Sequence, residues 1–429
     1  MIKKYNLKDI NIDELLVKEK EVEANVDDVV SKIIDDVINY GDVALIDYTA
    51  KFDKVKLDCL QVPEEEIDQA FNNMDEYFLQ TLKLASENIT AFHKEQLHKN
   101  FYITKKNGAI MGQKYTPVEK AGIYVPGGTA SYPSTVLMDA IPAKIAGVSE
   151  IIMVTPPDKN GKIKDEILAA AKIAGVTKIF KVGGAQSIAA LAHGTKSIPK
   201  VDKIVGPGNI FVATAKRMVY GMVSIDMIAG PSDVLVIADE NANAKHIAAD
   251  MLAQAEHDKL ATAILVTTND NLANLVTEEL EIQVEKLARC EIAKYSIEHT
   301  GKIIVVDNLM EAVEVCNKIA PEHLEICTKD PFSLLDHVKN AGSIFLGNNT
   351  PEALGDYLAG PNHTLPTNGT ARFSNPLSVD DFIKKSSFLY YPEDALLNVK
   401  DRVCDFAMRE GLQAHANSIA IRFEDDKGI

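Results

Sequence analysis

Tryptophan is absent from this 429-residue chain, and positive charge is scarce relative to negative charge. Lys and Arg together number 45 against 62 Asp and Glu, which gives a formal net charge of −17. A protein with this balance repels phosphate backbones and anionic lipid headgroups. We therefore expect neither nucleic acid nor a membrane as a partner.

Long apolar runs are also missing. No stretch is long enough to cross a bilayer, and the first residues, Met1 to Asp9, lack the apolar core of a signal peptide. These features predict a cytoplasmic protein.

Cysteine is sparse and lacks a metal-binding pattern. The five cysteines are an odd number and include no CxxC pair, which fits a reducing compartment and argues against a thiolate metal site. Cys327 ends an apolar, strand-like run. We interpret it as a buried thiol, with a catalytic nucleophile as the alternative.

The chain is too long for one compact core, so two large domains are expected. Residues 15–113 show a mostly helical pattern, whereas short β-runs alternate with helical stretches after residue 118. This alternation is typical of parallel sheets covered by helices, where ligands bind at the carboxyl ends of strands. The expected strands are 121–125, 151–154, 178–182, 203–205, 234–238, 263–267, 302–306 and 343–346. The expected helices between them include 134–146, 164–174, 185–192, 209–219 and 244–257.

Three glycine-rich turns follow predicted strands. They begin at Tyr124, at Val182 (Val-Gly-Gly-Ala-Gln186) and at Val205 (Val-Gly-Pro-Gly-Asn209). The last turn leads into a helix, whose free N–H groups suit a phosphate. None of the turns is a GxGxxG or Walker motif, so a nucleotide site and plain turn chemistry both remain open.

Glu322 and His323 are adjacent in an otherwise apolar stretch, residues 319–324. Pro321 predicts that the preceding helix ends here, because proline lacks an N–H and disfavours helical geometry in the residue before it. A neutral imidazole can accept a proton, and a carboxylate beside it can activate water. The alternative is that both residues merely cap the helix end.

Four further side chains form a possible zinc set. Gln254 and His257 are three residues apart on one helix face, Asp356 lies in the Gly- and Pro-rich segment 354–366, and His415 lies near the C-terminus. Two nitrogens and two oxygens suit zinc or a similar divalent ion. A packed or exposed histidine remains the alternative for each, because spacing does not show that they converge.

Six motifs together resemble the histidinol dehydrogenase family, and they follow that family's order and approximate spacing over essentially the whole chain. They are GPGN (206–209), AGPSD (229–233), QAEHD (254–258), APEHLE (320–325), GDYLAGPNHTLPT (355–367) and EGLQAH (410–415). One departure is Asp233, where we expect Glu.

The resemblance implies the last enzyme of histidine biosynthesis, which oxidises L-histidinol to L-histidine through L-histidinaldehyde with two NAD. It implies an α/β fold with two incomplete Rossmann-like domains, parallel sheets and small N- and C-terminal extensions, as in aldehyde and histidinol dehydrogenases. The expected domains are an extension (1–20), a discontinuous catalytic domain (21–120 and 234–376), an NAD-side domain (121–233) and a dimerisation segment (377–429).

The resemblance also implies roles for individual residues. Glu322 and His323 would be the catalytic acid/base pair. One zinc ion per subunit would be held by Gln254, His257, Asp356 and His415. NAD would contact Tyr124, Gln186 and Asn209. The substrate would contact Ser232, Gln254, His257, His323, Asp356, His363, Glu410 and His415. In the implied homodimer the C-terminal segment crosses over, so that Glu410 and His415 complete the partner's site.

Two other classes compete with this interpretation. A metal-dependent hydrolase would use zinc and Glu322 to activate water on an amide or ester, and it would not bind NAD. A nucleotide-binding regulator would bind NAD without turnover.

Overall fold

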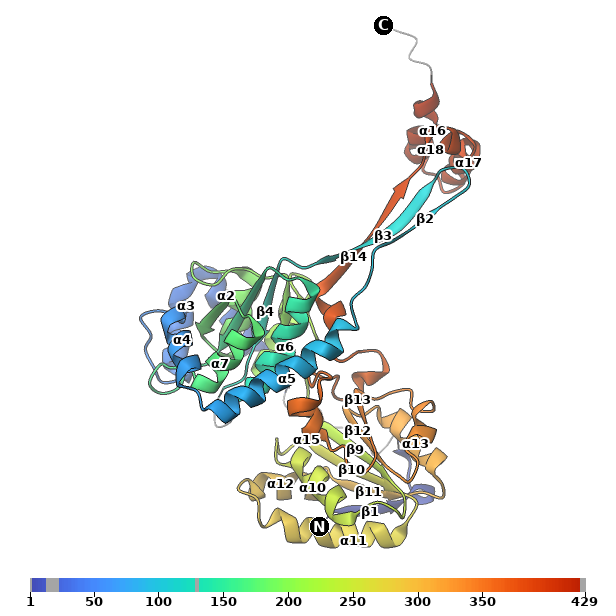
Figure 1. Cartoon of the computed structure of the whole chain (residues 1–429). Coiled ribbons are helices and arrows are strands. Elements are labelled where there is room, and N and C mark those ends of the chain that lie inside the picture. Colours follow the sequence, from blue (N-terminus) through green and yellow to red (C-terminus); the bar gives the residue numbers. More distant parts are fainter. Residues whose placement is uncertain (1, 13–22, 128–130, 425–429) are drawn as a thin grey trace. The chain divides into compact units, whose positions relative to one another are not determined.

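The computed structural model describes residues 2–12, 23–127 and 131–424. Much of the expected N-terminal extension, 13–20, and residues 128 and 129 of the Tyr124 turn therefore lie outside the described residues. The chain divides into two compact units (Figure 1). We call Met1–Leu97 with Val118–Phe382 the main unit, and His98–Pro117 with Ile383–Ile429 the C-terminal unit.

The main unit alternates strands and helices. Its strands are β1 (Lys3–Asn6), β4 (Lys120–Tyr124), β5 (Glu150–Thr155), β6 (Lys178–Lys181), β7 (Lys203–Val205), β8 (Ser224–Ile225), β9 (Asp233–Ala238), β10 (Thr262–Thr267), β11 (Lys302–Val305), β12 (His323–Cys327) and β13 (Ser343–Leu346). Its α-helices are α2 (Glu23–Tyr40), α3 (Asp42–Phe52), α4 (Glu64–Asn73), α5 (Glu76–Lys94), α6 (Pro133–Ala146), α7 (Asp165–Ala174), α8 (Gly184–His193), α9 (Ile210–Val219), α10 (Ala244–Ala255), α11 (Asp270–Val284), α12 (Cys290–His299), α13 (Leu309–Ile319), α14 (Phe332–Leu335) and α15 (Glu352–Leu354). Over the described ranges, no helix has the length and apolar character that crossing a membrane requires.

Two parallel sheets organise the main unit, as expected for the α/β class. One has the strand order β1-β11-β10-β9-β12-β13 and the other β6-β5-β4-β7-β8. Every strand pair within them is parallel. The expected strands and helices are confirmed, with end points that differ by a few residues.

Strand residues alternate between two apolar layers, so the strands carry uninterrupted apolar runs. In β5, Ile151 and Met153 join one hydrophobic cluster while Ile152 and Val154 join another. The first cluster also holds residues of α5, α6 and α7, and the second holds residues of α2, α3, α8 and α9. Helices α2, α3 and α5 thus pack against the five-stranded sheet. The domain boundaries given above stay a prediction.

The predicted acid/base dipeptide, Glu322 and His323, follows a helix end, as expected. Helix α13 ends at Ile319, its C-cap residue Ala320 has a left-handed φ of 54°, and Pro321 follows. Strand β12 then begins at His323. Glu322 therefore lies in the short connection between helix and strand, and His323 is the first residue of β12, which lies between β9 and β13 in the six-stranded sheet.

The C-terminal unit contains a sheet that the sequence analysis missed. Its antiparallel strands have the order β14-β3-β2, where β2 is Phe101–Thr104, β3 is Ile110–Pro117 and β14 is Ile383–Tyr390. The helical expectation for residues up to 113 was wrong here, because the aromatic and β-branched residues of β2 favour strands. The short helical C-terminal region is confirmed as α16 (Glu393–Leu397), α17 (Lys400–Arg409) and α18 (Gln413–Ala420).

Asn308 caps the N-terminal end of α13. The Asn308 carboxamide oxygen accepts from the Glu311 N–H at 3.0 Å, and its nitrogen donates to the Glu311 carboxylate at 3.0 Å. Asn308→Ala removes this N-cap and should lower the free energy of unfolding by about 1 kcal/mol in urea titrations. Asn308→Asp keeps the accepting oxygen and is the matched control. Equal stability of the wild type and Asn308→Ala would contradict the capping role.

Candidate functional site

A cavity of about 370 Å³ in the main unit brings most of the predicted site residues together. The predicted residues that line it are Asn209, Ser232, Gln254, His257, Glu322, His323, Asp356 and His363. Loops that follow β4, β7 and β8 contribute from the carboxyl ends of the five-stranded sheet. Ser232 and Glu322, however, precede β9 and β12. In the six-stranded sheet it is instead the amino ends of β9 and β12 that border this cavity and carry the predicted acid/base pair, so a site here would not follow the carboxyl-end expectation.

Asp233 fixes the position of Glu322. The Glu322 N–H donates to Asp233 Oδ1 at 2.9 Å, and the Asp233 N–H donates to Glu322 Oε2 at 3.2 Å. Asp233 and Glu322 stand at the amino ends of the neighbouring strands β9 and β12. In the sequence Asp233 is only a departure from the family pattern, because sequence spacing gives no cross-strand register and so does not reveal this positioning contact.

His323 has one satisfied ring nitrogen and one free one. Its Nδ1 lies 3.2 Å from the Asp233 carbonyl oxygen, an acceptor, so we assign the proton to Nδ1. Nε2 has no hydrogen-bond partner among the described residues. Burial lowers the pKa of His323 to about 3. The imidazole is therefore neutral near pH 7 and presents Nε2 as a proton acceptor.

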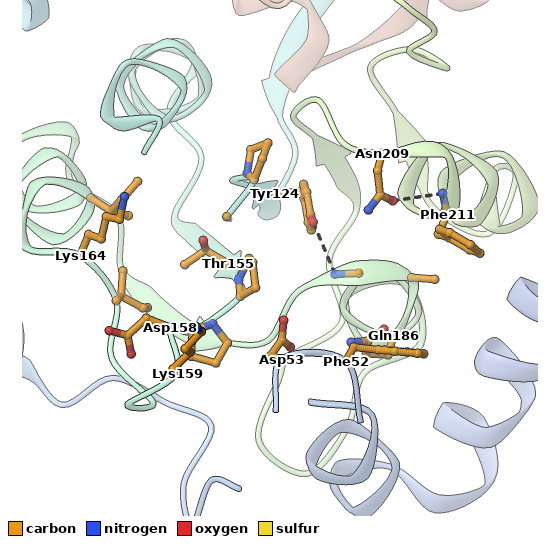
Figure 2. Close-up of a pocket in the computed structure, with 18 of the residues that line it drawn as sticks. Phe52, Asp53, Tyr124, Thr155, Asp158, Lys159, Lys164, Gln186, Asn209 and Phe211 are labelled. Atoms are coloured by element: carbon orange, nitrogen blue, oxygen red, sulfur yellow. Dashed lines mark hydrogen bonds between the residues drawn. The ribbon is translucent and has the colours of Figure 1, made fainter. Parts of the chain in front are cut away.

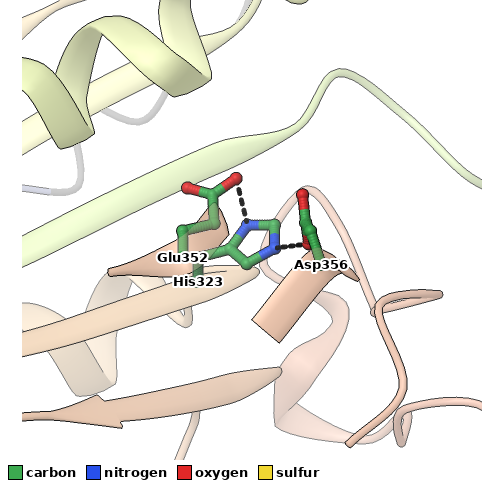
Figure 3. Close-up of side chains that lie close together, drawn as sticks. All are labelled: His323, Glu352 and Asp356. Carbon is green, nitrogen blue, oxygen red and sulfur yellow. Dashed lines mark ion pairs between the residues drawn. The ribbon is translucent and has the colours of Figure 1, made fainter. Parts of the chain in front are cut away.

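Carboxyl groups crowd around this imidazole (Figure 3). His323 Nδ1 lies 3.8 Å from Glu352 Oε1, and Nε2 lies 4.0 Å from Asp356 Oδ1. Burial raises the pKa of Glu322 and of Glu352 well above the ordinary value, and their negative neighbours raise it further. Burial also raises the pKa of Asp356 to about 6. Such crowding of buried acids suits a site that receives a cation.

The residues that could hold a metal only partly match the predicted set. His323, Glu352 and Asp356 offer ligand atoms that all lie within 4.8 Å of one another. Glu352 was not predicted, because it stands in none of the motifs. His323 was predicted only as a catalytic base.

Gln254 and His257, both predicted ligands, line the same cavity. With its carboxamide nitrogen turned toward Glu352, Gln254 donates to both carboxylate oxygens at 2.9 and 3.2 Å. The carboxamide oxygen is then the atom that can bind a cation. Burial lowers the pKa of His257, which favours the neutral form that metals require.

His363 is fixed at the edge of this cavity. Its Nδ1 lies 3.0 Å from the Asp356 carbonyl oxygen, and its Nε2 lies 3.2 Å from Thr135 Oγ1. Burial lowers the pKa of His363 to about 4. By contrast, Glu410 and His415 belong to the C-terminal unit, where both are exposed.

A larger cavity, of about 970 Å³, gathers the three predicted NAD residues (Figure 2). Tyr124, Gln186 and Asn209 all line it, and the Tyr124 hydroxyl accepts from the Gly184 N–H at 3.4 Å. The Asn209 carboxamide caps α9 by accepting from the N–H groups of Phe211 and Val212. Asn209 also lines the smaller cavity, so this residue borders both spaces.

The comparisons with known proteins agree on one family. The family model described as histidinol dehydrogenase matches residues 16–423. The histidinol dehydrogenase of Clostridium acetobutylicum is 58% identical over 410 residues, covering 95% of each chain. That of Bacillus cereus is 57% identical over 406 residues, covering 95% of this chain and 94% of its own. The crystal structure of histidinol dehydrogenase from Elizabethkingia anophelis has a TM-score of 0.94 at 38% identity, covering 100% of this chain and 99% of that one.

Proposed function

This chain belongs to the histidinol dehydrogenase family of oxidoreductases, and we propose that it oxidises L-histidinol to L-histidine through L-histidinaldehyde, using two NAD and one zinc ion per subunit. The observation that carries the proposal is the convergence on one cavity of an acid/base pair and three metal-compatible side chains. Asn209 joins that cavity to the larger one, which suits a dinucleotide.

The donor set fits zinc. Gln254, His257 and Asp356 supply two oxygens and one nitrogen from one cavity, and His415 of a second subunit would supply another nitrogen. Zinc, when bound, supplies positive charge among the buried carboxyls and an anchor for the amine and imidazole of histidinol. Glu352, which Gln254 contacts, orients that carboxamide from the second layer of the site.

The first oxidation uses His323. Its Nε2 accepts the proton of the substrate hydroxyl while the adjacent C–H bond releases a hydride to NAD, which gives the aldehyde. The hydrogen bond from Nδ1 to the Asp233 carbonyl keeps the ring in the tautomer that this step requires. Ser232 and His363 line the same cavity and orient the substrate.

The second oxidation needs an oxygen from water. Glu322, in its carboxylate form, takes a proton from a water molecule that attacks the aldehyde carbonyl, while the protonated His323 returns its proton to the carbonyl oxygen, which gives the hydrate. The resulting hydrate loses its hydroxyl proton to His323 and its hydride to a second NAD, which leaves the carboxylic acid. Adjacent Glu and His therefore provide separate bases for hydration and for the two dehydrogenation steps.

The proposal includes a homodimer with shared sites. The C-terminal unit exposes large apolar side chains, among them Tyr102, Leu389 and Phe406. Glu410 and His415 are exposed on the same unit, although they are candidate ligands. A second copy of the chain would cover the apolar surface and receive these two side chains.

We also infer a cytoplasmic location from the five free cysteines and the acidic composition.

The reaction is tested by following NADH absorbance with L-histidinol and NAD, before and after chelation and again after zinc is restored. Two NADH per histidine should form, activity should be lost with the metal, and zinc should restore it, because the metal anchors the substrate. Absence of NADH from the metal-loaded protein would contradict the dehydrogenase. Ester or amide hydrolysis by that protein would then support the hydrolase alternative.

The division of labour between the two bases can be separated by half-reaction. His323→Asn should slow both oxidations by at least about 100-fold, since it removes the base of both steps. Glu322→Gln should slow histidinaldehyde oxidation by a similar factor and histidinol oxidation only a few-fold, as measured by single-turnover kinetics. Equal losses in both half-reactions of Glu322→Gln would refute this division.

Shared sites predict complementation between inactive subunits. In mixed dimers of His415→Ala and Glu322→Gln subunits, one of the two sites regains a full set of residues. Such dimers should therefore recover about a quarter to half of the wild-type activity, depending on the fraction that are mixed. Each variant alone, taken through the same unfolding and refolding, is the control. No recovery would count against the crossing-over of the C-terminal segment.

A further inference from the structure

Three residues that line the larger cavity have buried polar atoms without a hydrogen-bond partner among the described residues. Asp53 Oδ2, Gln186 Oε1 and Ser131 Oγ are buried and have no hydrogen-bond partner in the part of the chain that the structure describes. All three residues line this cavity. Because unsatisfied buried acceptors are costly, their concentration here indicates a ligand that brings hydrogen-bond donors.

Asp53 has the least favourable position of the three. It caps the C-terminal end of α3, where its N–H donates to the Thr49 carbonyl at 2.8 Å and the helix dipole disfavours negative charge. Burial raises the pKa of Asp53 to about 6, and no charged group among the described residues opposes that shift. The next residue, Lys54, has a left-handed φ of 61°, a strained backbone for a residue with a side chain. The fold thus holds a carboxylate at this point despite several costs.

The lining of the two cavities shows which part of NAD would meet Asp53. Asn209 and Pro126 line both cavities, so the nicotinamide, which must reach the substrate, belongs near them. Asp53 lines only the larger cavity, together with the exposed ring of Phe52 (Figure 2). An exposed aromatic face beside a carboxylate suits an adenosine, whose base stacks and whose ribose donates two hydroxyl hydrogens.

We propose that Asp53 accepts hydrogen bonds from the vicinal hydroxyls of the adenosine ribose and thereby selects NAD over its 2′-phosphorylated form. A carboxylate can accept from both hydroxyls at once, whereas a 2′-phosphate removes one donor and places a second negative group against the carboxylate. The inference rests on the proposed function, because it requires NAD in the larger cavity.

The test compares steady-state kinetics of the metal-loaded enzyme with NAD and with NADP. Asp53→Ala should raise the KM for NAD about tenfold or more while kcat stays within about twofold, because the lost contacts are remote from the reacting carbon. The ratio of kcat/KM for NADP to that for NAD should rise at least about tenfold. Asp53→Asn keeps the shape of the side chain and one acceptor oxygen. Its KM for NAD should therefore rise less than in Asp53→Ala, and the ratio of kcat/KM for NADP to that for NAD should again rise. Asp58→Ala, at an exposed carboxylate nearby in the sequence, is the matched control and should change neither quantity.

Calorimetric titration locates the contact within the cofactor. Asp53→Ala should weaken ADP-ribose binding and leave nicotinamide mononucleotide binding unchanged. Loss of mononucleotide binding instead, or parallel losses for NAD and NADP, would overturn the ribose assignment.

A second variant separates this inference from the proposed function. Gln186→Met removes another unpartnered acceptor from the same cavity at similar volume. An increased KM for NAD in Gln186→Met with no change in Asp53→Ala would refute the role of Asp53 while leaving NAD in the cavity. Absence of NADH formation by the wild type would overturn the proposed function itself.

Discussion

The pair of hydrogen bonds between Asp233 and Glu322 is the constraint on which the geometry of the proposed acid/base pair depends. These bonds join the amino ends of the adjacent strands β9 and β12 and fix the Glu322 carboxyl group. The carbonyl of the same Asp233 faces His323 Nδ1 and so sets the imidazole tautomer. One residue on a fully buried strand therefore orients both proposed bases, which is the kind of support that precise proton transfer needs.

The cost of this arrangement is spread over the site. Glu322, Glu352 and His323 are buried. Burial raises the pKa of the two carboxyl groups and lowers that of the imidazole, so it favours the neutral form of each. A hydrophobic core of the same shape would be cheaper, since buried acids without a counter-charge destabilise the folded state. Buried ionisable groups with strongly shifted pKa values that cluster in one cavity are characteristic of a functional site rather than of a packed core.

Much of the fold could be predicted because β5, β9 and β10 are short apolar runs between helical patterns. The pairing of β3 with β14 in the C-terminal unit could not, since these strands are separated by more than 250 residues of sequence. The order of motifs gave most of the site's lining residues. Glu352 was missed because its contact with Gln254 depends on how α10 and α15 pack, and no local pattern reports that packing.

The two sheets contribute opposite ends of their strands to one cavity, and this asymmetry explains the division of tasks. Turns after β4 and β7 provide glycine-rich backbone and the border residue Asn209, which suits a mobile cosubstrate that must enter and leave twice. The amino ends of β9 and β12 provide side chains locked by cross-strand hydrogen bonds. The proposed reaction, with two hydride transfers, needs this combination, because the cofactor must be exchanged while the aldehyde stays oriented against the proposed bases His323 and Glu322.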